Sequence, residues 1–347
     1  MRQFFPLGEL TRREFLVQGA GATLAAAFPA GAVKGAAGPT PIRIANAAGG
    51  LNLVMAELMR RQRFLEAFGL APELLAVADG TRILGGIVSG SVDASFMSGF
   101  GQAFPAIEHG APIRIIGGGA LLPVLALFSA KPGIKTLKDL EGHTIGTGSV
   151  GALVYQLTVT LLLKYRVDVS GIRFVNIGSN ADIFRAVSAG TVDAGVGEAA
   201  LIPTAAQFGV HLIEHGDMSM ELADYTYQGA WTTEKELASR RDMLVRALAA
   251  YGRLYRFVQG PDARAAFFQA RRVVFAHAPD SDHQAMWSYI QRYRPFAVNL
   301  TLDPHRLRYM QELNVGFKVQ RAVLPFERVA DMSLAADALK LLGGLVS

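Results

Sequence analysis

The sequence contains no cysteine, which excludes both a disulfide framework and a cysteine-linked lipid anchor. Beyond residue 32 no run of 18 apolar residues occurs, so no membrane-spanning helix is predicted there. Long basic clusters with interleaved aromatic residues are also missing, because the net charge of +5 rests on short runs such as Arg60-Arg61, Arg240-Arg241 and Arg271-Arg272. We therefore expect no nucleic-acid partner and interpret these arginines as a solvated basic surface.

One short motif occurs twice, 100 residues apart. GSVDA at 90–94 is matched by GTVDA at 190–194, and an apolar stripe with helical spacing precedes each copy. The glycine ends the helix because it adopts a positive φ without a Cβ clash, and the next strand follows. We interpret Asp93 and Asp193 as turn and capping residues. The 347 residues and the long repeat period predict two similar α/β lobes with a ligand-binding cleft between them.

Residues 1–32 resemble an export signal. Arg12-Arg13 and Phe15-Leu16 precede a Gly/Ala-rich apolar run at 17–27, as in twin-arginine signals. Val17 stands where that pattern often has lysine, so Sec export is the alternative. The apolar run is too short for a bilayer of about 30 Å, and we expect cleavage near Ala32 and a periplasmic mature protein.

Polar residues and glycines follow the predicted strands of the first lobe, which include 41–46 and 73–78. In open α/β sheets ligands bind at the carboxyl ends of strands, where helix N-termini present free N–H groups. The contacts predicted from this lobe are Asn46, Gly49, Gly50, Leu51, Asp79, Ser98 and Gly99.

Four further phrases occur in a characteristic order. They are RFLEAFGL at 63–70, GAPI at 110–113, LKDLEGHTIG at 137–146 and LPFERVAD at 324–331. With these phrases the sequence resembles type II periplasmic solute-binding proteins, in the NMT1/THI5-like branch of nitrate, sulfonate and taurine receptors of ABC transporters. LKDLEGHTIG, which is similar to that family's entry into the second lobe, is the most specific match.

The resemblance implies an α/β type II periplasmic binding protein fold, with two similar doubly wound lobes joined by two crossing strands. The candidate crossings are 124–130 and 225–231. The expected division is an export signal at 1–32, a first lobe of 40–126 plus 229–347, and a second lobe of 127–228.

A glycine-rich loop at 146–151 matches the G-x-G-x-x-G pattern of dinucleotide-binding folds. That pattern also needs an acid about 20 residues on, at the end of the next strand, whereas the strand at 172–177 is followed by Gly-Ser-Asn. An exported NAD(P)-dependent oxidoreductase is the alternative function that this loop leaves open, and tight packing of glycines is the simplest structural explanation. We favour contacts from Ser149, Val150 and Gly151 to the solute, because the family places its second-lobe contacts here.

The remaining predicted contacts are Asn180, Glu198, Gln228 and Trp231. Many relatives carry an aromatic–acid–proline triplet where this chain has Gly197-Glu198-Ala199. The missing aromatic predicts a roomier cleft, in which Glu198 accepts a hydrogen bond from the solute or forms a cap or salt bridge. Gln228 and Trp231 would add an amide and an aromatic wall, and hinge packing is the alternative for Trp231.

No catalytic residue, metal site or cofactor is predicted. Only His211 and His215 are close in sequence, and 210–213 is predicted to be a strand, so the two do not form a zinc-binding helix face. No serine occupies a nucleophile elbow. The resemblance implies a monomeric ABC-importer receptor that closes by hinge motion on a small sulfonate, carboxylate or pyrimidine-like solute and delivers it to a membrane permease. A periplasmic sensor domain would share the same features.

Overall fold

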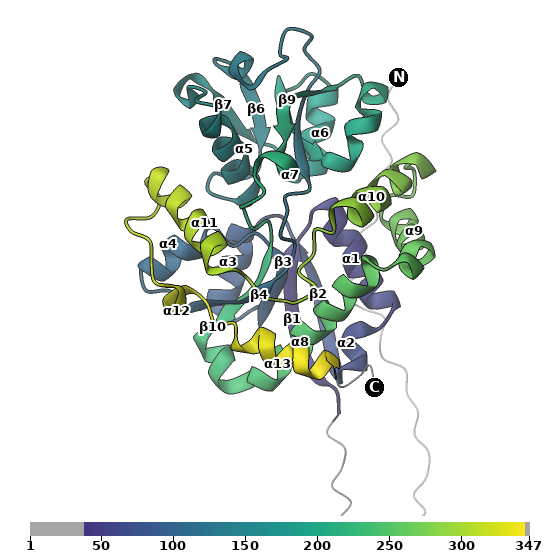
Figure 1. Ribbon diagram of the computed structural model, residues 1–347, viewed down its shortest axis with the longest axis vertical. Coiled ribbons are helices and arrows are strands. Elements are labelled where there is room, and N and C mark those ends of the chain that lie inside the picture. The colour runs from purple at the N-terminus through teal and green to yellow at the C-terminus, as the bar shows by residue number, and fades with distance from the viewer. Residues whose placement is uncertain (1–37, 344–347) are drawn as a thin grey trace, which may run out of the picture. The chain divides into compact units, whose positions relative to one another are not determined.

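Two five-stranded sheets form the framework of residues 38–343, the part of the chain that this computed structural model describes (Figure 1). The predicted export signal at 1–32 lies outside the described residues. The strands of the first sheet are β1 (Thr40–Ala47), β2 (Leu70–Val77), β3 (Ala94–Ser98), β4 (Ile113–Gly118) and β10 (Gly229–Thr233). Those of the second are β5 (Leu125–Ser129), β6 (Thr144–Thr147), β7 (Arg173–Asn176), β8 (Ala194–Glu198) and β9 (His211–Asp217).

Both sheets have the same plan, with the orders β2-β1-β3-β10-β4 and β7-β6-β8-β5-β9. β1 runs parallel to β2 and β3, and β6 runs parallel to β7 and β8. The antiparallel strand in each sheet, β10 or β5, is the first strand after the chain has left the other sheet. This confirms the predicted fold of two similar α/β lobes, here called the first and second lobe after their sheets. The predicted lobe boundaries at 126 and 228 stay predictions.

Each lobe also carries three or more helices of its own. In the first lobe these are α1 (Gly50–Arg61), α2 (Phe64–Ala67), α3 (Gly80–Ser89) and α4 (Ala103–Glu108). In the second lobe they are α5 (Leu153–Lys164), α6 (Asn180–Ser188) and α7 (Met218–Glu221), with the 3₁₀ helices η1 (Leu137–Leu140), η2 (Val169–Gly171) and η3 (Ala199–Phe208). The C-terminal segment forms α8 (Glu234–Val258), η4 (Pro261–Ala263), α9 (Arg264–Val274), α10 (Asp280–Tyr293), α11 (Pro304–Gly316), α12 (Phe326–Val329) and α13 (Ser333–Gly343).

The repeated motif forms the same clamp in both lobes. Gly90 and Gly190 follow α3 and α6 with φ of 74° and 70°, as predicted. The Asp93 carboxylate then accepts a hydrogen bond of 2.7 Å from the Arg43 N–H on β1, and the Asp193 carboxylate accepts one of 2.8 Å from the Thr144 N–H on β6. Each aspartate therefore ties the start of its strand to the neighbouring strand.

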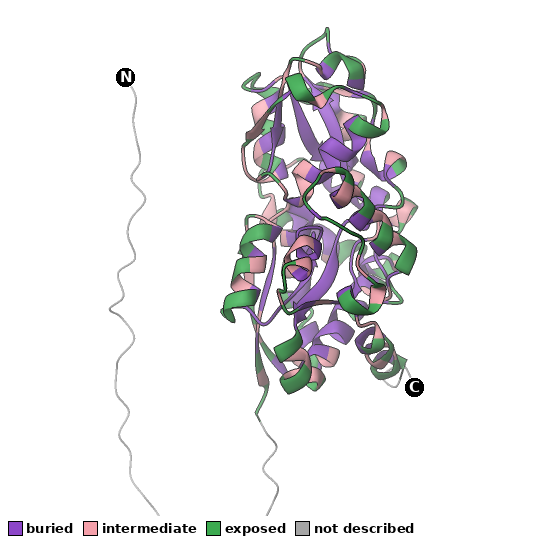
Figure 2. Ribbon diagram, turned by 90° about the vertical axis from the view of Figure 1, so that its left-hand side faces the viewer, coloured by how far each residue is buried: buried purple, intermediate pink, exposed green. Residues whose placement is uncertain are grey.

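The sheets are the buried centre of each lobe (Figure 2). Every residue of β3, β5 and β10 is buried. In the C-terminal segment α9 packs on α1 of the first lobe, whereas α10 packs on η3 of the second, so this segment contacts both lobes. Across 38–343 no helix is both long enough and apolar enough to cross a membrane.

Candidate functional site between the two lobes

A small cavity lies where the segments that follow the parallel strands of both lobes meet, and its volume is about 50 Å³. The return crossing between the lobes supplies the rest of the wall. The lining residues are Ala47, Gly49, Asn52, Ala78, Asp79, Gly80, Gly99, Gly148, Ala152, Leu153, Val154, Gly178, Ser179, Asn180, Tyr227 and Gln228. A cavity with walls from two lobes opens when a hinge moves the lobes apart and closes when the lobes come together.

Four helices begin at this interlobe cavity. α3 is capped by Asp79, whose carboxylate accepts two backbone N–H bonds of 2.9 and 3.1 Å from the first turn. α6 is capped by the hydroxyl of Ser179, which accepts a backbone N–H bond of 3.2 Å. The N-cap residues of α1 and α5 are Gly49 and Ala152, and neither supplies a capping side chain. The N-termini of α1 and α5 are therefore open to acceptors from elsewhere.

The two lobes are in contact around the cavity. The Ser149 hydroxyl of the second lobe donates a hydrogen bond of 2.9 Å to the Asp79 carboxylate of the first. A Cβ atom on Gly99 would lie 2.7 Å from Cβ of Leu153 on α5, so the backbone of one lobe packs directly on the other. The structure is thus a closed form.

Two predicted contacts present free amides to the cavity. Asn180 and Gln228 line it, and these residues are only 8% and 2% exposed. Among the described residues neither side-chain amide has a hydrogen-bond partner. Because neither amide is among the described polar atoms that are both sealed from solvent and unpaired, both groups remain available to a ligand.

Glu198 ends β8 in the second lobe, and its side chain reaches the start of α1 in the first lobe. Its Oε1 atom would be 2.5 Å from a Cβ on Gly50, and the Leu51 N–H faces the carboxylate. Arg271 on α9, also buried, places Nη1 3.9 Å from Glu198 Oε2. Burial raises the pKa of Glu198 against the opposing effects of Arg271 and the Leu51 N–H, and burial lowers the pKa of Arg271. Gly50, Leu51 and Glu198, all predicted contacts, therefore meet each other.

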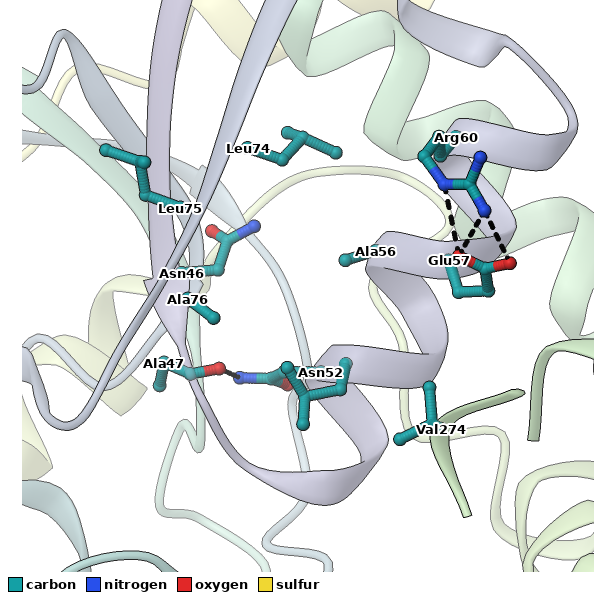
Figure 3. A pocket seen from close by; sticks show the side chains of 11 residues that line it. Asn46, Ala47, Asn52, Ala56, Glu57, Arg60, Leu74, Leu75, Ala76 and Val274 are labelled. Carbon is teal, nitrogen blue, oxygen red and sulfur yellow. Dashed lines mark hydrogen bonds and ion pairs between the residues drawn. The ribbon is translucent and has the colours of Figure 1, made fainter. Parts of the chain in front are cut away.

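A larger pocket of about 390 Å³ adjoins the cavity within the first lobe, between β2 and α1 (Figure 3). The two share Ala47 and Asn52, which are joined by a hydrogen bond of 2.9 Å. Asn46 lines this larger pocket rather than the interlobe cavity, and its amide is already paired with the backbone of β3 and the Tyr251 hydroxyl. Asn46 therefore joins strands instead of contacting a ligand in the cavity.

The predictions for Ser98 and Trp231 were wrong. Both residues are fully buried in the first lobe, and the Trp231 indole N–H donates a 2.8 Å hydrogen bond to the Ser98 hydroxyl. Neither lines the cavity, because β3 and β10 are adjacent strands that turn these side chains into the core. Trp231 therefore packs in the core beside the return crossing, which is the hinge-packing alternative that the sequence left open.

The glycine-rich loop also differs from its prediction. Gly146 lies within β6, and α5 begins only at Leu153, so Ser149, Val150 and Gly151 precede the helix instead of forming its first turn. Ser149 binds Asp79, Val150 is 75% exposed, and Val150 and Gly151 are outside the cavity lining. The strand that follows ends at Asn176 without an acid, so the loop does not have the geometry of a dinucleotide site.

The expected roomier cleft is wrong as well. A Cβ on Gly197 would lie within van der Waals overlap of the Phe184 ring, which fills this space inside the second lobe. The missing aromatic therefore makes room for a core phenylalanine and not for a ligand, and the interlobe cavity is small.

Sequence reasoning missed Asn52, Leu153, Tyr227 and Arg271. Leu153 and Tyr227 are apolar or aromatic residues near predicted contacts, and Asn52 follows the predicted Gly-Gly-Leu. The interpretation of Arg271 as part of a solvated basic surface was wrong, because its side chain is buried beside Glu198. Within 38–343 no group of three or more metal-binding side chains is clustered.

The NMT1/THI5 like family model matches residues 60–263, more than half of the chain. The chain belongs to the NMT1/THI5-like family. This confirms the resemblance inferred from the sequence. Curated protein sequences gave no match.

Solved structures share the fold of this NMT1/THI5-like protein. The alkanesulfonate-binding protein SsuA from Xanthomonas axonopodis pv. citri, bound to MOPS, has a TM-score of 0.68 at 19% identity over 87% of this chain and 99% of that one. The periplasmic aliphatic sulphonate binding protein SsuA from Escherichia coli has a TM-score of 0.65 at 17% identity over 84% and 91%. The periplasmic nitrate-binding protein NrtA from Synechocystis PCC 6803 has a TM-score of 0.67 at 10% identity over 87% and 89%. At these identities the likeness establishes a periplasmic binding protein fold.

Proposed function

We propose that this NMT1/THI5-like protein is the extracytoplasmic receptor of an ABC importer, which captures a small organic solute between its lobes and delivers it to a membrane permease. The observation that supports the proposal most is the interlobe cavity, because its wall is divided between the two lobes and the crossing that joins them. The fold shared with sulfonate-binding and nitrate-binding proteins supports the same function.

Closure by hinge motion is the proposed signal to the permease. A solute that contacts both lobes stabilises the closed form relative to the open one, since in the open form it keeps its contacts with one lobe only. The direct contacts between lobes, such as Ser149 with Asp79, add to the same equilibrium. No bond in the solute is broken in this cycle.

Five of the predicted contacts belong to the proposed solute site. They are Gly49, Asp79, Gly99, Asn180 and Gln228, together with the cavity-lining Leu153 and Tyr227. We further propose that residues 1–32 direct export to the periplasm by the Tat or Sec route and that the receptor acts as a monomer.

Distance measurement between the lobes tests the proposal directly. Because the chain has no cysteine, Val88→Cys on α3 and Met220→Cys on α7 place one spin label on each lobe at exposed positions. A thermal-shift screen of sulfonates, carboxylates and pyrimidines first identifies a stabilising solute, since binding to the folded state raises its stability.

The expected result is a shorter and narrower label distance when that solute is added. A label pair placed within one lobe, Val88→Cys with Glu327→Cys, should show no change. A stabilising solute that leaves the interlobe distance unchanged would contradict hinge closure, and turnover of a nicotinamide cofactor would favour the oxidoreductase instead.

A further inference from the structure

The charges around the interlobe cavity differ from those expected for an anion site. Asp79 is the one lining residue with a carboxylate, and no lining residue among those described is lysine, arginine or histidine. Glu198 is outside the lining, at the start of α1, where its carboxyl group faces Arg271 of α9. A solute with a negative charge would therefore meet a like charge with no cation in the wall.

The helix N-termini at the cavity are largely occupied by the protein itself. Backbone N–H groups at a helix start are a common site for anions. Here Asp79 accepts two N–H groups of α3, Ser179 accepts one N–H group of α6, and the Leu51 N–H of α1 faces Glu198. Only α5, behind Ala152, begins without an acceptor of this kind among the four. The protein's own groups thus take the positions that an anion would use.

The free polar groups of the lining include two primary amides, together with the Tyr227 hydroxyl, which has no hydrogen bond among the described residues. Asn180 and Gln228 each offer one carbonyl acceptor and two N–H donors, and both are more than nine-tenths buried without a partner among the described residues. A ligand that carries both a donor and an acceptor can pair with each of these amides. A carboxamide, a urea or the N–H/C=O edge of a pyrimidine does this without a net charge.

The volume limits the size of the group that is enclosed. One water molecule occupies about 10–15 Å³ of such a cavity. The interlobe cavity of about 50 Å³ therefore holds roughly four non-hydrogen atoms. Urea, acetamide, acetate and nitrate all have four. Size therefore does not separate amides from anions, and the separation rests on charge and hydrogen bonding.

We propose that the solute is recognised through an uncharged amide-type group, a carboxamide, urea or pyrimidine edge, which binds the side chains of Asn180 and Gln228 in the interlobe cavity. This inference rests on the proposed receptor function and narrows its solute class away from sulfonates, carboxylates and nitrate. Asp79 discriminates between amides and anions, because its negative charge repels an anion while its oxygens can accept a hydrogen bond from an N–H group.

Matched pairs of small probes test the solute class. Acetamide against acetate, and urea against nitrate, differ in charge but hardly in size or shape. Each is titrated at constant ionic strength into ¹⁵N-labelled protein, and the side-chain NH₂ signals of Asn180 and Gln228 are followed by NMR. We expect each amide to bind at least ten-fold more tightly than its anionic counterpart.

Variants identify the groups responsible. Asn180→Asp and Gln228→Glu keep the shape of each side chain but remove its donors, and each should weaken acetamide binding at least ten-fold. Gln207→Glu, at an exposed position on η3, is the matched control and should leave binding unchanged. Asp79→Asn keeps an N-cap side chain on α3 and should raise nitrate affinity about ten-fold.

The outcomes separate this inference from the receptor function. Tighter binding of acetate or nitrate than of acetamide or urea overturns the solute class, as does amide binding that Asn180→Asp and Gln228→Glu leave unchanged. Absence of any shift with all four probes also overturns it. In each of these cases the receptor function still stands if another solute shortens the distance between the spin labels, and it fails only if no solute does so.

Discussion

A Cβ atom on Gly50 would lie 2.5 Å from Oε1 of Glu198, although Gly50 begins α1 in the first lobe and Glu198 ends β8 in the second. The same Cβ would lie 2.7 Å from the Phe275 ring. A larger residue at position 50 would therefore displace the Glu198 side chain or hold the two lobes further apart. The contact with Glu198 makes closure sensitive to a single methyl group, and the contact with Phe275 makes the packing of α9 on α1 sensitive to it as well.

Gly50→Ala should hold the lobes apart. The added methyl overlaps Glu198 in the closed form, so the spin-label distance should lengthen and solute affinity should fall at least ten-fold. Its overlap with the Phe275 ring remains in both forms and should also lower the thermal stability. Gly85→Ala on α3 is the control, since a Cβ there meets no atom within 4 Å. A Gly50→Ala protein with unchanged label distance and solute affinity would contradict this prediction, because it would show that the Glu198 side chain makes room for the methyl group.

The charge of Glu198 should make closure depend on pH. Burial raises the pKa of Glu198 above its ordinary value of 4.5, so the closed form favours the protonated acid. Its contribution to closure is complete below pH 4.5 and is lost as pH rises through the raised pKa, where the closed-to-open ratio should fall by up to about ten-fold per pH unit.

Label distances measured from pH 4 to pH 8 without solute check this dependence. Glu198→Gln, which cannot ionise, should flatten the profile, and the exposed Glu327→Gln should retain it. The raised pKa has no role in closure if the profiles of Glu198→Gln and the unmodified protein coincide.

Ser149 should strengthen solute binding without touching the solute. Its hydroxyl bonds to Asp79 across the lobes, so Ser149→Ala should remove about 1 kcal/mol from the closed form alone and weaken solute binding roughly five-fold. Asp79 keeps its two N–H bonds to α3, which leaves the fold intact. Ser188→Ala, whose hydroxyl bonds only within α6, is the control in the same calorimetric titration. Equal affinities for the two variants would contradict the role of Ser149.

The repeat and the lobe plan could be predicted from the sequence because they depend on local signals. A glycine after an amphipathic helix and an aspartate before a strand specify the same unit wherever they occur, and both copies fold as expected. The positions of Asp79 and Asn180 follow from the rule that ligands bind at the ends of parallel strands, whereas Gln228 was predicted from the return crossing that the resemblance implies.

The errors came from side-chain direction and from contacts between distant segments. Ser98 stands at the carboxyl end of β3, yet its side chain faces Trp231 in the core, and one residue further along Gly99 lines the cavity. Arg271 meets Glu198 only because α9 folds back onto α1. Neither relationship has a local sequence signal, since alternation along a strand and helix packing are decided by the tertiary structure.

Asp193→Asn should lower stability most clearly at neutral pH. Although burial opposes it, hydrogen bonds from Lys131, the Thr144 N–H and His143 lower the pKa of Asp193 to about 2. A lowered pKa contributes stability above the ordinary value of 3.8 and loses it as pH falls towards 2. We expect the variant to lose about 1–2 kcal/mol at pH 7 in urea unfolding and almost nothing at pH 2. Exposed Asp262→Asn is the control, and an equal loss at both pH values would assign the effect to packing and not to charge.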